Sequence, residues 1–364
     1  MIFINGYFLE HPYSGTGLVT KELLDALSRQ GGLTQSAVLC FIEPSTEVRH
    51  LLEKWKVSCR VLPTPAYIPA FLKRFYWESI AIPLFLRSFS SYKYFSTYAH
   101  PMLIHCMFSQ CFMMLHDVFP WKYPAYAKKI LRKMHNWALK KFLMHSSVQL
   151  ITVSQTSKND IYTFFQRDSI VLHNGADHLL KEPLLDKDYL QKKWGICEPY
   201  IFYMGGYDDR KNIHILVETL RLLVRSFPEY TIVFGGGALY KTALYSSPEE
   251  LVAHEAHMIH TGFLSMSEMR TLFHHAALFV HASRDEGCNL AVGEALMEGT
   301  PVCISHIAVH EELWGSYGHL IDFTDAQKAS TMMKEILPTL QRRSAPHTIY
   351  SWHDAAANLL QLLA

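Results

Sequence analysis

Short apolar runs alternate with helical periodicity along most of the chain. The first run, Met1 to Asn5, ends at Gly6 and is followed by a glycine-rich loop and by helical spacing from Leu18 to Leu27. A strand, a glycine loop and a helix in this order are typical of the start of an α/β domain. Further buried strands are predicted at Ser36–Ile42, Ser58–Leu62, Cys111–Leu115 and Gln149–Val153, and helices at Glu47–Trp55, Lys122–Leu143 and Lys158–Phe165. This alternation predicts a parallel sheet covered by helices.

The second half of the chain repeats the pattern. Tyr200–Met204 is a predicted strand that ends at Gly205 and Gly206, and Asn212–Phe227 has helical spacing. More strands are predicted at Tyr230–Phe234, Leu278–His281, Pro301–Ile304 and Leu320–Ile321, and an amphipathic helix at Trp352–Leu363. The fold class expected from both halves is α/β, with two parallel-sheet domains in tandem.

The length of 364 residues also favours two domains, since single cores rarely grow beyond roughly 250–300 residues. Turn chemistry at His173–Asp177 and a charged stretch at Lys181–Lys193 suggest the crossing point. We therefore expect domains at residues 1–180 and 181–350. Ligands collect at the carboxyl ends of parallel strands, so the active site is expected in a cleft between the domains.

The composition narrows the classes of function. Hydrophobic residues make up 49% of the chain and charged residues 18%, which argues against long disordered segments. With 34 basic and 33 acidic residues, the chain has no overall field to attract nucleic acid, which is not expected as a partner. No secretion signal and no apolar stretch of about 20 residues is visible, and the seven cysteines show no CxxC pair. A cytoplasmic protein is expected.

No metal site and no cofactor are expected. His100, His105, Cys106, Cys111 and His116 lie near one another in the sequence, but their spacing matches no zinc pattern. No Asp-x-Asp box follows a predicted strand either.

The segment from Ser283 to Val302 carries the most chemical information. Asn289 is a natural N-cap, so Leu290–Met297 is predicted to be a helix whose first N–H groups attract phosphate, and Gly287 lets a ligand approach the backbone. Glu286 lies just before this helix and Glu294 lies within it. One carboxylate can face a sugar while the other accepts hydrogen bonds from ribose.

Glu286 and Glu294, with seven residues between them, resemble the paired-glutamate signature of family 4 glycosyltransferases, and Thr300-Pro301-Val302 closes the pattern as in that family. The resemblance implies a GT-B fold, in which two Rossmann-like domains face each other across a cleft, and a nucleoside-diphosphate sugar as donor. It implies transfer with retention of the anomeric configuration. It also implies that the final helix, residues 351–364, packs back on the first domain.

The loop from Tyr203 to Asn212 resembles the glycine-then-Arg-Lys loop of the same family. Arg210 and Lys211 would stabilise the departing diphosphate, and Gly205 would contact the donor. Many relatives carry another arginine where this chain has Gly206, so Arg210 is expected to supply that contact. These two cations could replace a metal ion, which predicts metal-independent activity.

Three other segments complete the resemblance. Gly15 and Gly17 lie in a loop similar to the one that approaches the donor phosphates. His116-Asp117-Val118-Phe119-Pro120 resembles the His-Asp-x-x-Pro element of a mannosyltransferase-like branch, in which the histidine reaches the donor sugar and the aspartate meets the acceptor. Phe263 and Leu264 lie where relatives hold the base. This branch favours GDP-mannose as donor.

The function expected from the sequence is transfer of a hexose, such as mannose, to a hydroxyl of a glycan or lipid-linked acceptor in cell-surface polysaccharide assembly. Two alternatives remain open. A nucleotide-sugar epimerase would use the same scaffold without an acceptor, and a non-catalytic nucleotide-sugar-binding subunit would need no turnover.

A basic, aromatic-rich stretch at residues 122–142 allows two interpretations. It contains seven Lys and Arg residues and no acidic residue. As an amphipathic helix it could lie on the inner face of the membrane, near a lipid-linked acceptor. It could equally be an ordinary helix with a solvated cationic face.

Overall fold

The chain divides into two compact α/β units. The computed structural model describes residues 1–103, 111–124, 130–145, 148–236, 257–342, 344, 346 and 349–364. One unit comprises Met1–Asn174 together with Trp352–Ala364, and the other comprises Gly175–Ser351. The division thus falls after Asn174, whereas the sequence analysis placed it after residue 180. Residues 175–181 go with the second unit because the 3₁₀ turn η5 (Asp177–Lys181) contacts helices α11 (Met266–His275) and α12 (Leu290–Met297).

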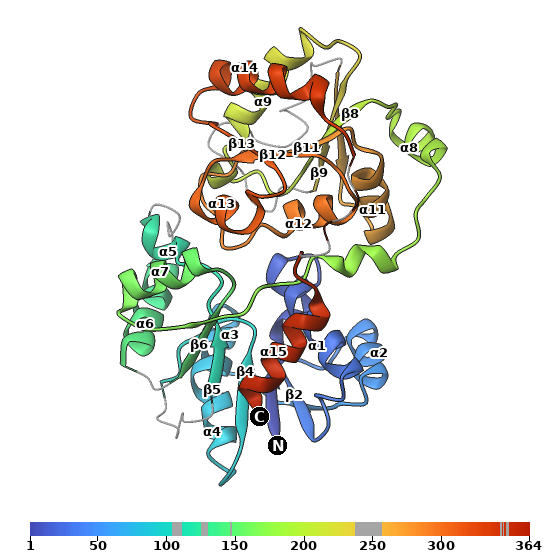
Figure 1. Ribbon diagram of the computed structural model, residues 1–364. Helices are drawn as coiled ribbons and strands as arrows, with labels where there is room; N and C mark the ends of the chain where they lie inside the picture. Colours follow the sequence, from blue (N-terminus) through green and yellow to red (C-terminus); the bar gives the residue numbers. More distant parts are fainter. Residues whose placement is uncertain are drawn as a thin grey trace. The chain divides into compact units, whose positions relative to one another are not determined.

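The first unit is built on a seven-stranded parallel sheet in the order β3-β2-β1-β4-β5-β6-β7 (Figure 1). Its strands are β1 (Ile2–Asn5), β2 (Ser36–Cys40), β3 (Ser58–Val61), β4 (Lys93–Ser96), β5 (Cys111–Met114), β6 (Gln149–Thr152) and β7 (Ile170–Val171). The strand order reverses at β1, which pairs with both β2 and β4. In such sheets the loops at the carboxyl ends beside the reversal form the ligand site.

The helices of the first unit differ from the predicted ones around residue 124, and those between residues 70 and 86 were not predicted. They are α1 (Gly15–Arg29), α2 (Thr46–Lys54), α3 (Ala70–Tyr76), α4 (Ile82–Leu86), α5 (Phe119–Lys122), α6 (Ile130–His145), α7 (Gln155–Phe165) and α15 (Trp352–Leu363), with the 3₁₀ turn η1 (Tyr7–Glu10) and the π-helical turn η2 (Trp77–Ala81). The single helix predicted at Lys122–Leu143 is wrong: α5 ends at Lys122 and α6 begins at Ile130. Pro124 lies between them, where a proline disfavours continuing a helix. Residues 125–129 are outside the described residues.

The glycine loop after β1 is held by its own backbone. Ser14 starts α1 by accepting a hydrogen bond from the Gly17 N–H at 3.0 Å, and its hydroxyl donates to the His11 carbonyl at 2.9 Å. A Cβ atom at Gly17 would lie 1.9 Å from that carbonyl oxygen, so only glycine fits. Gly15 has open space where its Cβ would be. Gly17 therefore has a structural reason to be glycine, whereas the space around Gly15 would admit a side chain. The predicted contacts of both glycines with the donor stay predictions.

Helix α15 packs on α1, although the whole second unit separates them in the sequence. The Gln30 side chain donates to the His353 carbonyl at 2.8 Å. The Leu360 side chain lies so close to Gly32 that a Cβ there would be 2.4 Å from it. Leu359 is fully buried in the same contact region.

The second unit contains a six-stranded parallel sheet in the order β10-β9-β8-β11-β12-β13. Its strands are β8 (Tyr200–Met204), β9 (Thr231–Gly235), β10 (Met258–Gly262), β11 (Leu278–His281), β12 (Val302–Ser305) and β13 (His319–Ile321). Its helices are α8 (Lys187–Trp194), α9 (Ile213–Val224), α11, α12, α13 (Ala308–Trp314) and α14 (Ala326–Ile336), with the short 3₁₀ turns η6 (Asp209–Lys211) and η7 (Leu337–Thr339). The strand order reverses at β8, which lies between β9 and β11.

The core of the second unit joins α9 and α14 to one face of this sheet. Leu216 and Met333 from the helices are fully buried with Ile201, Phe234 and Val280 from the strands. The apolar face of α9 has the 3.6-residue period that the sequence showed. Across the described residues, no helix is both long and apolar enough to cross a membrane.

We expect Leu359→Ala to lower the free energy of unfolding of the first unit by about 2–5 kcal/mol, because it leaves a cavity under α15. Chemical denaturation followed by circular dichroism would measure the change. Asn358→Ala, at the exposed neighbouring position, is the matched control. Equal stability of the two variants would mean that α15 does not hold the first unit together.

Candidate functional site

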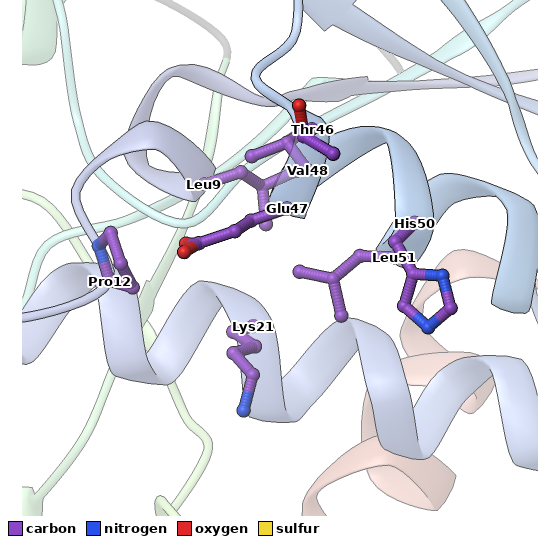
Figure 2. A pocket seen from close by; sticks show the side chains of 8 residues that line it. All are labelled: Leu9, Pro12, Lys21, Thr46, Glu47, Val48, His50 and Leu51. Carbon is purple, nitrogen blue, oxygen red and sulfur yellow. The ribbon is translucent and has the colours of Figure 1, made fainter. Parts of the chain in front are cut away.

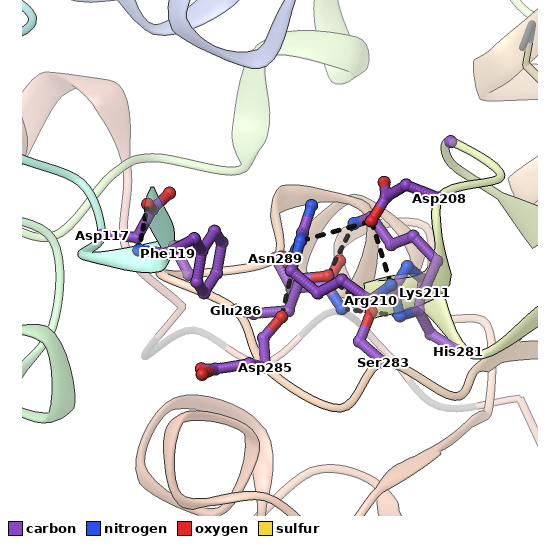
Figure 3. A network of polar contacts seen from close by, with 12 residues as sticks. Asp117, Phe119, Asp208, Arg210, Lys211, His281, Ser283, Asp285, Glu286 and Asn289 are labelled. Atoms are coloured by element: carbon purple, nitrogen blue, oxygen red, sulfur yellow. Dashed lines mark hydrogen bonds and ion pairs between the residues drawn. The ribbon is translucent and has the colours of Figure 1, made fainter. Parts of the chain in front are cut away.

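Three of the predicted catalytic side chains meet in the second unit, at the carboxyl ends of β8 and β11 (Figure 3). Glu286 Oε1 accepts hydrogen bonds from Lys211 Nζ and from Ser283 Oγ, both at 2.6 Å. Glu286 Oε2 accepts from Arg210 Nη1 at 2.7 Å. The Arg210 guanidinium also donates to the Asp285 carbonyl at 3.0 Å. Two loops that are about 75 residues apart in the sequence therefore share one carboxylate.

The backbone holds both cations in place. The Asp208 side chain accepts from the Arg210 N–H at 3.2 Å at the start of η6, and Asn212 follows η6 in the left-handed region with φ 56°. The Arg284 N–H donates to the Arg210 carbonyl at 2.8 Å. The Asn212 amide donates to the Phe323 carbonyl at 2.9 Å. The loops after β8, β11 and β13 are thus bonded to one another, which fixes where the cations project.

The electrostatics of this cluster are dominated by the two cations. Burial would raise the pKa of Glu286, but Lys211 and Arg210 outweigh it and hold that pKa well below its ordinary value. Burial lowers the pKa of Lys211 despite the neighbouring carboxylate. One carboxylate is thus shared by two mostly buried cations. An incoming anion can compete with Glu286 for them.

Helix α12 starts where the sequence predicted, with one difference at its cap. It begins at Leu290 after Asn289, but the Asn289 side chain makes no capping hydrogen bond to the helix. Asn289 has φ 64° and ψ 75°, a left-handed conformation in place of the extended one of an ordinary N-cap. The prediction that its side chain caps α12 is therefore wrong. Leu290 is half-buried at the first turn, and Gly287 is buried in the preceding loop.

Glu294 points away from solvent within α12. Its side chain is 4% exposed, and its Oε1 lies 3.2 Å from Nε2 of His178 in η5. The neighbouring Gly293 allows α12 to approach this segment, because a Cβ there would lie 2.7 Å from the Ala176 methyl group. Its predicted contact with ribose stays a prediction.

The remaining predicted donor residues line turns of the same sheet. A Cβ at Gly205 would lie 2.8 Å from the Tyr203 hydroxyl, which donates to the Gly206 carbonyl at 2.5 Å. Leu264 is nearly buried, whereas Phe263 beside it is 67% exposed. An exposed aromatic ring directly after β10 can stack on a base.

His116 and Asp117 lie in the first unit, just after β5. His116 Nε2 is 2.7 Å from the Thr97 carbonyl oxygen, and since a carbonyl only accepts, this nitrogen donates. Burial lowers the pKa of His116, so the ring is neutral. Asp117 Oδ1 accepts from the Phe119 N–H at 3.1 Å (Figure 3). The structure thus sorts the predicted residues into two sets, one in each unit.

The first unit also contains a pocket of about 490 Å³ beyond the carboxyl ends of β1 and β2 (Figure 2). Four of its lining side chains are apolar and four are polar or charged. It is formed by Leu9, Pro12, Lys21, Thr46, Glu47, Val48, His50 and Leu51. Five of these residues come from helix α2, and the other three come from η1, the loop after it and α1.

Several buried polar residues of the second unit were not predicted from the sequence: His178, His281, Ser283 and His310. His281 carried a usable signal, since it ends a predicted strand, as His116 nearly does. Ser283 lies three residues before Glu286 but has no distinctive spacing. His178 and His310 acquire their partners only through the tertiary fold.

The described residues contain no group of three or more His, Cys, Asp or Glu side chains arranged to hold a metal ion. His100 and His116 form hydrogen bonds with Tyr94 and with the Thr97 carbonyl, respectively. Of the other three residues considered in the sequence, Cys111 is buried in β5, and His105 and Cys106 are outside the described residues.

Comparison with known proteins places these features in context. Residues 186–344 match the family model described as "Glycosyl transferases group 1". The O-antigen chain mannosyltransferase B of Escherichia coli is 27% identical over 232 residues, which is 62% of this chain and 60% of the relative. The O-antigen chain mannosyltransferase RfbU of Salmonella typhimurium strain LT2 is 25% identical over 226 residues, covering 61% and 59%. The matches thus span about 60% of the length of these relatives.

The fold comparison covers the whole chain. The crystal structure of HepE from Anabaena in complex with UDP and glucose has a TM-score of 0.71 and 15% sequence identity, covering 100% of this chain and 98% of that chain. This likeness confirms the fold predicted from the sequence. The chain has the GT-B fold with two Rossmann-like α/β domains, the second of which carries the match to group 1 glycosyl transferases.

Proposed function

We propose that this protein is a retaining glycosyltransferase that moves a hexose from a nucleoside-diphosphate sugar to a hydroxyl in cell-surface polysaccharide assembly. The observation that carries the proposal is the convergence of Arg210 and Lys211 on Glu286 in the loop before α12. The group 1 match over residues 186–344 covers this cluster. The two O-antigen mannosyltransferases support the reaction class and the pathway type.

The cations would act on the leaving group. The bond between the anomeric carbon and the diphosphate oxygen breaks, and the acceptor oxygen bonds to that carbon on the same face. The acceptor proton passes to the departing diphosphate. Negative charge grows on the diphosphate during this step, and fixed positive groups in a mostly buried site stabilise it most effectively. Lys211, Arg210 and the first N–H groups of α12 would supply these contacts.

Glu286 would change partners when the donor binds. Without the donor, both of its oxygens are occupied by Lys211, Arg210 and Ser283. The diphosphate, which carries more negative charge, would draw the two cations away. The freed carboxylate oxygens could then accept hydrogen bonds from sugar hydroxyls. Glu286 thus keeps the cations in place until the diphosphate binds.

The other predicted residues would hold the rest of the donor. Glu294 would accept from the ribose, and Phe263 would stack on the base while Leu264 packs beneath it. His116 donates through Nε2 to Thr97, so Nδ1 of the neutral ring is an acceptor for a sugar hydroxyl. GDP-mannose is the proposed donor, on the basis of the His116-Asp117 element and the mannosyltransferase relatives.

We also propose that turnover needs no metal ion. A divalent ion would serve to neutralise the diphosphate. Lys211 and Arg210 already place two positive charges beside Glu286, and their side chains are only 13% and 18% exposed, respectively. In this site they would take over the role of the metal.

The acceptor would bind to the first unit. Its pocket combines apolar walls from Leu9, Val48 and Leu51 with Lys21 and His50 (Figure 2). Such a lining fits a sugar that is attached to a lipid, since it offers hydrogen bonds beside apolar surface. Asp117 would contribute to binding the same acceptor.

Helix α6 supports peripheral contact with a membrane. Met134, Trp137 and Met144 are exposed on this helix. Together with Lys141 they follow one another at intervals of three or four residues, so they lie along one stripe of α6. Lys133 is exposed beside them. Exposed apolar side chains among cations fit the headgroup region of anionic lipid.

Two other functions would use the same second unit. A nucleotide-sugar epimerase would convert the donor without an acceptor. A non-catalytic binding subunit would retain nucleotide binding without turnover. The cluster of Lys211, Arg210 and Glu286 favours transfer, because binding alone does not require two buried cations beside the leaving group.

The reaction itself is the first test. GDP-mannose, with UDP- and dTDP-sugars for comparison, would be incubated in EDTA with lipid-diphosphate-linked sugars, and products analysed by NMR. We expect a product with the donor's anomeric configuration, and a loss of roughly 10²–10³-fold in kcat for Lys211→Ala. Lys334→Ala on α14 is the control. An inverted product, an epimer formed from donor alone, or inactivity in EDTA alone would each contradict the corresponding part of the proposal.

Exchange of partners at Glu286 gives a second prediction. Glu286→Gln removes the charge that competes for the cations, so GDP should bind more tightly than to the wild type, while kcat falls by roughly 10²-fold. Isothermal titration calorimetry and turnover assays would measure both effects. Glu335→Gln, at an exposed position on α14, is the control. Weaker binding of GDP to Glu286→Gln would rule out the exchange.

Membrane contact can be tested with vesicles that contain anionic lipid. We expect Trp137→Ala combined with Lys133→Ala and Lys141→Ala to reduce co-sedimentation, because each lysine contributes about 1 kcal/mol near such a surface. Tyr162→Ala, which removes an exposed aromatic ring from α7, is the control. Equal pelleting of all three proteins would mean that α6 is an ordinary solvated helix.

A further inference from the structure

A buried hydrogen-bond relay lies behind the start of α12. The Asn289 side-chain nitrogen is 3.1 Å from Nδ1 of His281 and 2.9 Å from Nε2 of His310. An amide nitrogen only donates, and it carries two hydrogens. Both imidazoles therefore accept, and the two rings use both amide hydrogens of Asn289.

The surroundings fix the protonation of both rings. His310 Nδ1 is 2.9 Å from the Ser305 carbonyl, to which it must donate, so its Nε2 is the acceptor that Asn289 needs. His281 accepts through Nδ1, which places its proton on Nε2. Its ring stacks on Tyr203 with centroids 5.4 Å apart. Burial lowers the pKa of His310 to about 4 and that of His281 well below its ordinary value, so both rings stay neutral.

The relay explains why Asn289 does not cap its own helix. Asparagine is among the strongest N-cap residues, and its side chain usually bonds to N–H groups of the first turn. Here the amide is held between two rings at a left-handed backbone position with φ 64°. The first turn of α12 is therefore left without this capping contact. The Val292 N–H donates to the Asn289 carbonyl at 3.2 Å, and the N–H groups of Leu290 and Ala291 before it are the ones that the proposed function assigns to the diphosphate.

We propose that His281 and His310 are positioning residues, which hold the Asn289 amide away from α12 so that the helix start binds the donor diphosphate. Neither histidine needs to touch the ligand, as both are fully buried. If one ring is replaced by an apolar one, the amide loses a partner. Asn289 then turns to cap α12 and competes with the phosphate. This inference rests on the proposed function, since it assumes that a diphosphate binds at this helix.

The test compares binding with and without phosphate. GDP and UDP would be titrated by calorimetry, and guanosine and uridine by ligand-observed NMR. We expect His310→Phe to weaken diphosphate binding by about tenfold, as expected for loss of a helix-end contact with an anion, and to leave nucleoside binding nearly unchanged. His281→Phe, which preserves a ring against Tyr203, carries the same expectation if His310→Phe does not fold.

A suppressor distinguishes release of the amide from general damage. Asn289→Gly keeps a residue that tolerates positive φ but has no amide to cap the helix. In the His310→Phe background it should restore most of the diphosphate binding. Met333→Ala, which opens a cavity in the buried core away from the relay, is the control for lost stability and should not weaken binding of the diphosphate selectively.

The outcomes separate this inference from the function on which it rests. If Lys211→Ala weakens GDP binding but His310→Phe does not, or if Asn289→Gly fails to restore it, the positioning role is wrong and the proposed function stands. An equal loss of guanosine and GDP binding would also overturn the positioning role. If wild type and Lys211→Ala bind diphosphates equally, both proposals fail.

Discussion

The chemistry of the second unit depends on one interaction, in which Lys211 and Arg210 share the buried carboxylate of Glu286. Glu286 would be costly to bury alone, and so would Lys211, but together with Arg210 and Ser283 each has a partner. The partners come from the loops after β8 and β11, so the contact also fixes those loops relative to each other. Asp208 Oδ1 also lies 3.6 Å from Arg210 Nε, so both cations are paired with carboxylates. Under the proposed function, the diphosphate would compete with these carboxylates for the two cations.

Much of the fold could be predicted from the sequence, because buried apolar runs separated by segments of helical periodicity are typical of a parallel α/β sheet. The strands that were missed show where this signal fails. β4 spans only Lys93–Ser96 and begins with a lysine, and β10 includes His260 and Thr261, so neither is a continuous apolar run. β7 has only two residues, Ile170 and Val171, which is too short to show a pattern. The division of the chain after Asn174 differs from the predicted one after residue 180, because composition cannot rank the turn at residues 173–177 against the charged stretch after it. Packing of η5 on α12 decided it.

The part of the candidate site whose charged residues directly follow predicted strands could be predicted from the sequence. Arg210 and Lys211 follow one strand and Glu286 follows another, and carboxyl ends of neighbouring parallel strands lie at one edge of a sheet. The relay of His281, Asn289 and His310 was not predictable. Its members are ordinary in sequence, and the local rule for Asn289 favours a helix cap. Tertiary hydrogen bonds from two buried rings override that rule, which no local pattern can reveal.

The place of α15 has a consequence for how the protein is made. Because Trp352–Ala364 belongs to the first unit, the second unit is an insertion within the first, joined to it by two chain segments. During synthesis, Gly175–Ser351 is complete before the first unit has its covering helix. Until then, the surface of α1 and of the turn at Gly32 that α15 covers remains exposed. The second unit can therefore complete its fold before the first unit, which needs α15 to complete its own.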